Sequence, residues 1–284
     1  MLSINYLKEH KEEAIELLAV KNFDAKELIE EAIATDSKRR EAQKKRDDIL
    51  AESKKMAKEI GRLFSQGKAE EANAIKEQTA QFKQDSKSLD EEYQSSSTKL
   101  RDILLQIPNI PHESVPAGNN ENDNQEVSRL GDIPELNKEA LPHWELAKKY
   151  NIIDFDLGSK VSGAGFPFYR AAGARLQRAL INFFLDNAIA AGYEEYQPPL
   201  VVNEESGYGT GQLPDKDGQM YYINEDNLYL IPTAEVPVTN IYRDVILQEK
   251  DLPVKNVAYS NCFRREAGSY GKDVRGLNRI HQFD

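Results

Sequence analysis

The chain of 284 residues has little cysteine: Cys262 is the only one, so no internal disulfide can form. Such usage is typical of reducing compartments. No apolar run approaches the roughly 18 residues that a membrane-spanning helix needs, and the N-terminus lacks the basic and apolar regions of a signal peptide. These absences predict a cytoplasmic protein that does not insert into a membrane.

The sequence also lacks the residue patterns of zinc sites, P-loops and dinucleotide-binding sites. The four histidines are scattered and Cys262 has no neighbouring thiol, so the ligand spacing of a zinc site is missing. No P-loop occurs, and no Gly-x-Gly-x-x-Gly follows a strand pattern. We therefore predict no protein-built metal site and no P-loop or dinucleotide fold.

Proline is absent from residues 1–107, and glycine occurs there only at Gly61 and Gly67. The stretch is rich in helix formers. Positions 72, 75, 79, 82, 86, 89, 93, 96, 100 and 103 recur at alternating spacings of three and four, the 3.5-residue repeat of a coiled coil. The preceding stretch has the same spacing at positions 49, 53, 56, 60 and 63, and the seam continues backwards through positions 46 to 28 as a weaker interface. With a short connection at 65–68, the pattern predicts an antiparallel helical hairpin about 54 Å long at ~1.5 Å per residue.

Positive charge is scarce overall but concentrated in this hairpin. The chain carries 37 Lys and Arg against 48 Asp and Glu, a net charge of −11, which argues against nucleic-acid binding by the whole surface. Residues 38–46 nevertheless contain six basic side chains in nine positions, and Lys54 and Lys55 continue the stretch. A segregated cationic arm suits phosphate backbones. The alternatives are a solvated face or an oligomerising coiled coil.

The organisation changes after residue 107. Prolines 108, 111, 116 and 134 and the polar tract 117–124 indicate an extended linker. We therefore predict a helical arm over 1–107, a linker over 108–135 and a mixed α/β domain over 136–284. In that last part, residues 170–191 have the spacing of a helix that ends before Gly192, and a strand at 193–202 is broken by Pro198 and Pro199.

The apolar run 228–238 predicts a buried strand with Thr233 and Glu235 on one face. Two polar groups on a buried face need partners. One interpretation is a ligand that carries both an ammonium and a hydroxyl group. The other is hydrogen bonding within the protein.

The final segment, 260–284, predicts a hairpin. One alternating stretch ends in Phe263–Glu266, a turn containing Gly268, Gly271 and Gly276 follows, and a second stretch at 279–283 returns. Arg264 and Glu266 would share one face, as would Arg279, His281 and Phe283 on the partner strand. A guanidinium, a carboxylate and an aromatic ring together suit a nucleotide. The alternative is an amphipathic hairpin with surface charges.

The blocks at 263–268, 275–277 and 281–284 resemble motif 2 of class II aminoacyl-tRNA synthetases, in the form carried by bacterial-type seryl-tRNA synthetases. Blocks at 108–116, 163–166, 173–176, 209–214 and 230–235 resemble the same family in the same order. The helix at 170–191 with Pro199 resembles motif 1, which forms the dimer interface. The resemblance covers the whole chain, which stops before motif 3.

The resemblance implies an α+β protein: an N-terminal antiparallel helical hairpin, the coiled-coil arm, followed by an incomplete class II synthetase antiparallel β-sheet domain flanked by helices. It implies a homodimer whose arm binds tRNA(Ser), with tRNA(Sec) as a further acceptor to consider. The candidate tRNA contacts are Lys38, Arg39, Arg40, Lys44, Lys45, Arg46, Lys54 and Lys55.

The resemblance also implies the chemistry. Serine and ATP, with Mg²⁺, would form seryl-adenylate and pyrophosphate, and the seryl group would pass to the 3′-terminal ribose of the tRNA. Arg264 would bridge the serine carboxylate and the α-phosphate and, with Glu266, would be catalytic. The remaining candidates are Thr233, Ala234 and Glu235 for serine, with Arg264, and Arg264, Arg265, Glu266 and Phe283 for ATP.

The sequence differs from the family pattern in two respects, and both change what we expect. Arg265 replaces a residue that is more often small and polar in the family, and we expect it to face away from Arg264 and to be neutral for the mechanism. Motif 3 is absent, so we expect residues 1–284 alone not to activate serine. Two other functions stay open: a paralogue that acts on an acceptor other than tRNA, and a non-catalytic RNA-binding or coiled-coil protein.

Overall fold

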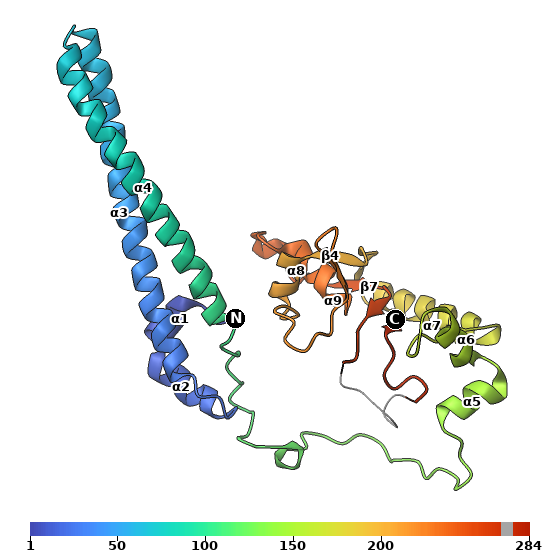
Figure 1. Cartoon of the computed structure of the whole chain (residues 1–284). Helices are drawn as coiled ribbons and strands as arrows, with labels where there is room; N and C mark the ends of the chain where they lie inside the picture. The colour runs from blue at the N-terminus through green and yellow to red at the C-terminus, as the bar shows by residue number, and fades with distance from the viewer. Residues whose placement is uncertain (268–274) are drawn as a thin grey trace. The chain divides into compact units, whose positions relative to one another are not determined.

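The computed structural model describes residues 1–267 and 275–284, apart from the side chains of residues 77, 78 and 80. It divides into two compact units, Met1–Asp132 and Ile133–Asp284, which are described separately (Figure 1). None of the helices in these described ranges is both long and apolar enough to cross a membrane.

The first unit is dominated by two long antiparallel helices, α3 (Lys26–Ser65) and α4 (Ala69–Leu104) (Figure 1). Every position of the predicted seam is buried or half-buried on both helices. The coiled-coil hairpin predicted from the 3.5-residue repeat is therefore confirmed. We call α3 and α4 the arm.

Gly67 allows the arm to reverse direction. Its φ is +75°, a conformation that is costly for residues with a Cβ. Lys68 N donates to Leu63 O at 3.0 Å, and Gly67 N donates to Phe64 O at 3.1 Å. These two bonds form a Schellman motif, which satisfies carbonyls that the end of α3 would leave unpaired.

The base of the arm has a hydrophobic core that the sequence analysis did not anticipate. Two short helices, α1 (Ile4–Glu9) and α2 (Lys11–Ala19), bring Leu7 and Leu18 against Ile29 and Ile103, and all four side chains are buried. The base can therefore fold around apolar burial, while the outer part of the arm depends on its two-helix seam. The same unit also contains a 3₁₀ turn, η1 (Glu121–Asp123), after the arm.

The second unit combines short helices and short strands. Its helices are α5 (His143–Tyr150), α6 (Phe155–Val161), α7 (Ala172–Ala190), α8 (Glu204–Gly209) and α9 (Glu235–Thr239), with 3₁₀ turns η2 (Asn240–Tyr242) and η3 (Glu249–Asp251). Its strands are β1 (Ile153–Asp154), β2 (Phe168–Tyr169), β3 (Glu194–Tyr196), β4 (Val201–Asn203), β5 (Tyr222–Ile223), β6 (Leu228–Leu230), β7 (Asn256–Ala258), β8 (Cys262–Phe263) and β9 (Gln282–Phe283).

The strands pair mostly antiparallel, as the predicted fold class requires. β4, β6 and β5 form a three-stranded antiparallel sheet, and β1–β2 and β8–β9 are antiparallel pairs. The β3–β7 pair is parallel. Helix α7 ends as predicted, because Gly192 at φ +85° lets Tyr193 N donate to Ala188 O at 3.1 Å.

One buried residue connects the strands that carry the site. Ile231 follows β6 and is completely buried. Its N–H donates to Leu200 O at 3.0 Å, and its carbonyl accepts from Phe263 N at 2.8 Å. The β8–β9 hairpin is thus joined to the β4–β6–β5 sheet two residues before Thr233.

Candidate active site and cationic arm

The segment after β6 is not the long strand predicted over 228–238, and that prediction is wrong. Strand β6 ends at Leu230, and α9 begins at Glu235. Pro232 cannot donate a ladder hydrogen bond, and the Thr233 hydroxyl accepts from Glu235 N at 3.3 Å, so the chain turns into a helix. Thr233 and Glu235 therefore do not alternate on the face of a strand.

The turn nevertheless leaves polar groups available. Thr233 and Ala234 are half-buried, and Glu235 is exposed. Within the described ranges, no cation lies within ion-pair distance of the Glu235 carboxylate. The segment thus offers a hydroxyl and a free negative charge at one turn.

The predicted hairpin is confirmed by the β8–β9 pair, in which Cys262 lies opposite Phe283 and Phe263 opposite Gln282. Arg264 N extends the pairing by donating to His281 O at 3.0 Å. Gly268 and Gly271, in the predicted turn, lie outside the described residues.

Arg264 joins the two halves of the candidate site. Its Nε donates to Pro232 O at 3.1 Å, which places the side chain beside the residue that precedes Thr233. Its Cζ lies 4.8 Å from the centroid of the Phe283 ring. The structure therefore brings the Thr233 turn, a guanidinium and an aromatic ring together.

Glu266 departs from the predicted geometry. Its φ is +48°, in the left-handed region, so it does not continue the strand, and the expected Arg264–Glu266 alternation is wrong. Its carboxylate, only 13% exposed, accepts from Arg279 Nη1 at 3.3 Å. This ion pair joins the two chains of the hairpin just beyond the ladder.

Arg265 faces other neighbours than Arg264 does, as predicted. Its Cζ lies 4.5 Å from the Tyr221 ring centroid, and its Nε donates to Met220 O at 3.0 Å. Arg265 N donates to Gln219 O at 2.8 Å. The residue fastens the hairpin to the segment that leads into β5.

Aromatic side chains support the hairpin in a way that no sequence pattern predicted. His281 Nδ1 lies 2.7 Å from the Tyr221 hydroxyl, and its ring stacks on Phe166 with centroids 5.3 Å apart. Gly165, at φ +87°, allows this approach, because a Cβ there would lie 2.1 Å from His281 Cδ2. Burial raises the pKa of Tyr221, opposed by the nearby Arg265. Gly165 and Phe166 belong to the 163–166 block that resembles the family, but the spacing of that block did not predict a contact with His281.

His143 supports the returning end of the hairpin. Its Nε2 accepts from Leu277 N at 2.8 Å, and a Cβ on Gly276 would lie 2.2 Å from that nitrogen. Arg275, another residue of this return, is exposed. His143, which has no motif around it in the sequence, thus contacts the backbone of the returning segment.

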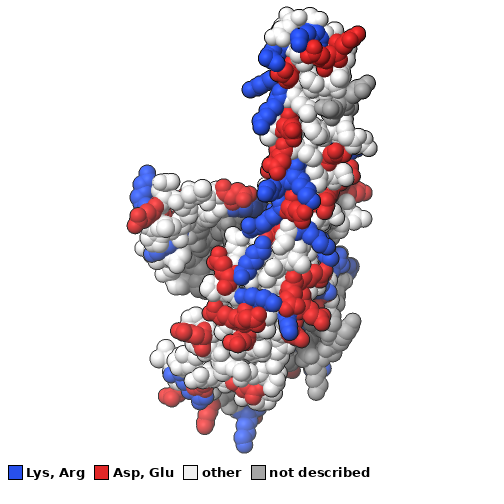
Figure 2. Space-filling model, turned by 90° about the vertical axis from the view of Figure 1, so that its left-hand side faces the viewer, with Lys and Arg blue, Asp and Glu red and all other residues white. Residues whose placement is uncertain are grey.

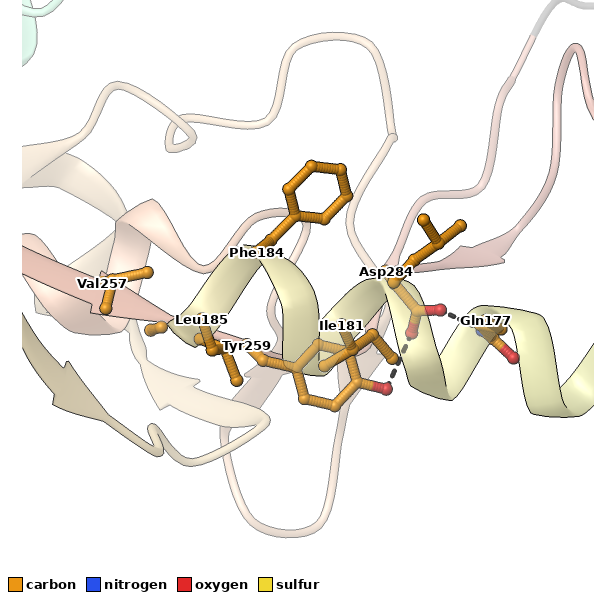
Figure 3. A pocket seen from close by; sticks show the side chains of 9 residues that line it. Gln177, Ile181, Phe184, Leu185, Val257, Tyr259 and Asp284 are labelled. Atoms are coloured by element: carbon orange, nitrogen blue, oxygen red, sulfur yellow. Dashed lines mark hydrogen bonds between the residues drawn. The ribbon is translucent and has the colours of Figure 1, made fainter. Parts of the chain in front are cut away.

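Two hollows lie near the end of the chain. One of about 340 Å³ separates α7 from β7, and its wall is mostly apolar (Figure 3). In it the Tyr259 hydroxyl donates to Asp284 at 3.0 Å, and burial raises the pKa of Tyr259. The other, of about 420 Å³, is lined in part by Phe166, Tyr169 and Phe283. Neither is lined by Arg264 or by the Thr233 turn.

The arm carries the predicted basic stretch, but its members differ in environment. Arg39 and Arg46 lie in the seam, where hydrogen bonds to Asp36 and Asp90 raise their pKa values above the ordinary arginine value. Arg40 Nε donates to Asp36 at 2.8 Å, and Lys45 pairs with Glu41 at 2.7 Å.

The other basic candidates are free. In the described part of the chain, these exposed lysines have no ion-pair partner: Lys38, Lys44, Lys54 and Lys55. Figure 2 shows basic side chains clustered along the arm among acidic ones. The surface that can reach phosphates is therefore smaller than the sequence run suggests.

Asp36 anchors the base of the arm. Its side chain is completely buried and contacts the cations of Lys8, Arg39 and Arg40. Burial acts to raise its pKa, but the hydrogen bonds from Lys8 and Arg39 outweigh this effect, and the net pKa is lowered. The carboxylate is therefore held in its charged form.

Comparison with known proteins identifies two family matches. Residues 1–111 match the Seryl-tRNA synthetase N-terminal domain, and residues 221–284 match the tRNA synthetase class II core domain (G, H, P, S and T). The serine--tRNA ligase of Salinibacter ruber is 48% identical over 284 residues, covering 100% of this chain and 66% of that protein. The chain thus spans slightly less than two thirds of the length of this relative.

Two solved structures of the same family are similar to this chain over its whole length. The seryl-tRNA synthetase of Pyrococcus horikoshii complexed with ATP superposes with a TM-score of 0.81 at 30% identity, covering 100% of this chain and 68% of that one. The cytoplasmic serine-tRNA ligase of Naegleria fowleri in complex with AMP gives a TM-score of 0.75 at 26% identity, covering 100% and 69%.

Proposed function

The chain belongs to the seryl-tRNA synthetase family, and on this premise we propose that it supplies the tRNA-binding arm and the motif 2 part of the active site of a serine--tRNA ligase. The protein would activate serine with ATP and transfer it to tRNA(Ser), with tRNA(Sec) as a further acceptor. The position of Arg264 between the Thr233 turn and Phe283 is the observation that carries the catalytic part of this proposal.

The first step needs charge neutralisation and alignment more than covalent help from the protein. A serine carboxylate oxygen attacks the α-phosphorus of ATP, and the bond to pyrophosphate breaks. Arg264 would hold the serine carboxylate and the α-phosphate together. Its guanidinium is suited to this because it can donate to two oxygens at once.

Recognition of serine falls to the turn before α9. The Glu235 carboxylate, exposed and without a cation near it in the described structure, would pair with the substrate ammonium. The Thr233 hydroxyl and the backbone at Ala234 would face the small side chain. Glu235 can act in this way from the first turn of a helix, without the strand geometry predicted from sequence.

Recognition of adenine falls to the hairpin. Phe283 would stack on the base, and Arg264 would lie close to the phosphates that follow it. Glu266 would accept from the adenine amino group, which it could do while Arg279 holds its other oxygen. Arg265, turned toward Tyr221, would support ATP binding indirectly, and the exposed Arg275 would contact pyrophosphate or the acceptor end.

Mg²⁺ would accompany ATP because of the dense charge of the triphosphate. Among the described residues, no group of three or more His, Cys, Asp or Glu side chains could hold a metal ion. These residues do not fit a protein-built metal site, and we assign none of them to Mg²⁺.

The arm would bind the tRNA through its cationic stretch, residues 38–55, which is proposed to face the phosphate backbone. We also propose a homodimer. Support comes from α7, which resembles motif 1 and exposes large apolar side chains: Leu176 is 56% exposed, Phe183 59% and Phe184 64%. Charging of tRNA would place the protein in the cytoplasm.

Binding of tRNA(Ser) and of other tRNAs to the 284-residue chain, measured over a salt series, tests the proposal. We expect tRNA(Ser) to bind more tightly, with a steep salt dependence. Deleting residues 50–63 and 69–82, 14 from each leg, keeps the 65–68 turn and the phase of the seam and removes the outer arm. The core around Ile29 and Ile103 stays, so the variant should fold and lose the preference.

Other outcomes would contradict it. Equal binding of all tRNAs favours a general RNA-binding coiled-coil protein. No tRNA binding, together with binding of a non-hydrolysable seryl-adenylate analogue, favours a paralogue that uses another acceptor.

A further inference from the structure

Tyr93 occupies an unusual place in the arm. It lies in the seam of α4 and is half-buried. Two arginines from α3, one heptad apart, approach its ring: Cζ of Arg39 lies 5.7 Å from the ring centroid and Cζ of Arg46 lies 5.0 Å from it. Arg39 Nη1 also donates to the Tyr93 hydroxyl at 3.5 Å. We call these three residues the Tyr93 stack.

Acidic groups hold both guanidinium groups in this position. Arg46 Nη1 forms an ion pair with Asp90 of α4 at 2.7 Å, across the two helices. Arg39 Nη2 forms one with the buried Asp36 at 2.7 Å. The side chain of Arg46 is 22% exposed and that of Arg39 is 21% exposed, whereas Lys44, Lys54 and Lys55 are exposed to solvent.

Apolar packing is weak where the stack lies. Of the neighbouring seam positions, Thr35 and Ala42 on α3 and Ser96 on α4 are small, and Leu89 on α4 is a half-buried apolar side chain. Small side chains bury little area, so they contribute little to holding two helices together. A cation–π contact that is partly withdrawn from water contributes more than an exposed one. The Tyr93 stack is therefore a principal cross-helix contact in this part of the arm.

The Tyr93 stack lies between the base of the arm and its outer part, so a change at the stack affects the position of the outer part. Helix α3 ends at Ser65, 19 positions after Arg46, which is about 28.5 Å at 1.5 Å per residue. The free lysines Lys54 and Lys55 lie on this outer part. Loosening the helix pair at Tyr93 would thus displace the charges that are available for phosphate contacts.

We propose that Tyr93 is a positioning residue, which uses Arg39 and Arg46 to brace the arm, while the phosphates of a bound tRNA meet the exposed lysines Lys44, Lys54 and Lys55. The inference rests on the proposed tRNA-binding function and divides the basic stretch by role. The two arginines act on tRNA through the geometry of the arm, and the lysines act by direct neutralisation.

Salt dependence separates the two roles. Each lost phosphate contact lowers the slope of log K against log salt by about 1. Loss of bracing lowers the population of free arms that have the binding geometry, so binding weakens. The same lysines still contact phosphate in the complex, so the slope does not change. We therefore expect Lys54→Ala and Lys55→Ala each to reduce the slope by about 1 and to leave thermal unfolding of the arm unchanged.

The variants of the stack should behave in the opposite way. Tyr93→Leu, which keeps an apolar side chain, should lower the melting temperature of the arm and weaken tRNA(Ser) binding several-fold at every salt concentration, with an unchanged slope. Tyr93→Phe keeps the ring and should restore most of the affinity. Arg46→Gln should resemble Tyr93→Leu.

Circular dichroism melting and binding to tRNA(Ser) at several salt concentrations, with the 284-residue chain, give both readouts. A slope reduced by about 1 in Arg46→Gln with an unchanged melting temperature would overturn the inference and leave the proposed function standing. Absence of salt-dependent tRNA binding in the unmutated chain would overturn both.

Discussion

The guanidinium of Arg264 lies over the ring of Phe283, with Cζ 4.8 Å from the ring centroid. The two residues come from opposite strands of one hairpin, and Arg264 also donates to Pro232 O. One side chain therefore contacts both the aromatic ring proposed for adenine and the turn proposed for serine.

Arg264 and Arg265 form a matched pair, since they are adjacent and face different neighbours. A charge-assisted hydrogen bond contributes about 1.5–3 kcal/mol. We therefore expect Arg264→Ala to weaken binding of a non-hydrolysable seryl-adenylate analogue by about 10- to 100-fold, measured by titration calorimetry. Arg265→Ala should weaken it much less, because Arg265 contacts Met220 and Tyr221. Equal losses would contradict the assignment of Arg264.

Thr233 can be tested by separating its hydroxyl from its shape. The hydroxyl accepts from Glu235 N at the start of α9. Thr233→Val removes it at nearly constant volume and should cost about 1 kcal/mol of stability, as a lost hydrogen bond does, and weaken analogue binding. Thr233→Ser keeps the hydroxyl and should bind nearly as the unmutated chain does. Analogue binding unaffected by Thr233→Val would exclude a hydroxyl contact.

Gly165 and Gly163 test the support beneath the hairpin. Both have positive φ, +87° and +114°, but a Cβ at Gly165 would lie 2.1 Å from His281, whereas nothing lies within 4 Å at Gly163. Gly163→Ala should therefore cost only backbone strain, about 1–2 kcal/mol. Gly165→Ala should cost about 1–3 kcal/mol more, because His281 must move. Chemical denaturation measures the difference, and equal costs would show that His281 yields freely.

Asp36 predicts a pH dependence of stability. Its folded-state pKa is lowered, so its contribution is fully present above the unfolded value of about 3.9 and is lost as the pH falls through the folded value. Asp36→Asn should destabilise the first unit by about 1–3 kcal/mol at neutral pH, since buried cations lose their partner.

The difference between Asp36→Asn and the unmutated chain should shrink as the pH falls below 3.9, followed by melting of the helical signal. Glu41→Gln removes an exposed pair with Lys45 and is the control. It should leave the melting temperature nearly unchanged. A constant difference across the pH series would contradict the role given to Asp36.

Local periodicity explains why the arm could be predicted from sequence. Heptad spacing reports which side of a helix is buried, so both seams were correct, including the places of Arg39 and Arg46. What the spacing could not show is that those arginines contact Tyr93 and are not free. That distinction depends on residues more than forty positions away in the chain.

The hairpin and the turn after β6 could be predicted only in part, because long-range contacts determine their geometry. The strand pairing of β8 and β9 followed from alternation, but the left-handed backbone of Glu266 did not, because it is fixed by long-range contacts such as Arg279. The strand predicted over 228–238 failed although Pro232 and Pro237 were visible signs against it. His143 and His281 had no motif around them, and only the fold gave them partners.

The tight reversal at Gly67 has a consequence for how such arms can vary in length. Because the turn sits at the tip, far from the core around Ile29 and Ile103, residues can be added to both legs without disturbing that core. Seven residues in each leg preserve the phase of the seam and lengthen the arm by about 10.5 Å. The reach of the arm can therefore change in discrete steps while the core at its base stays the same.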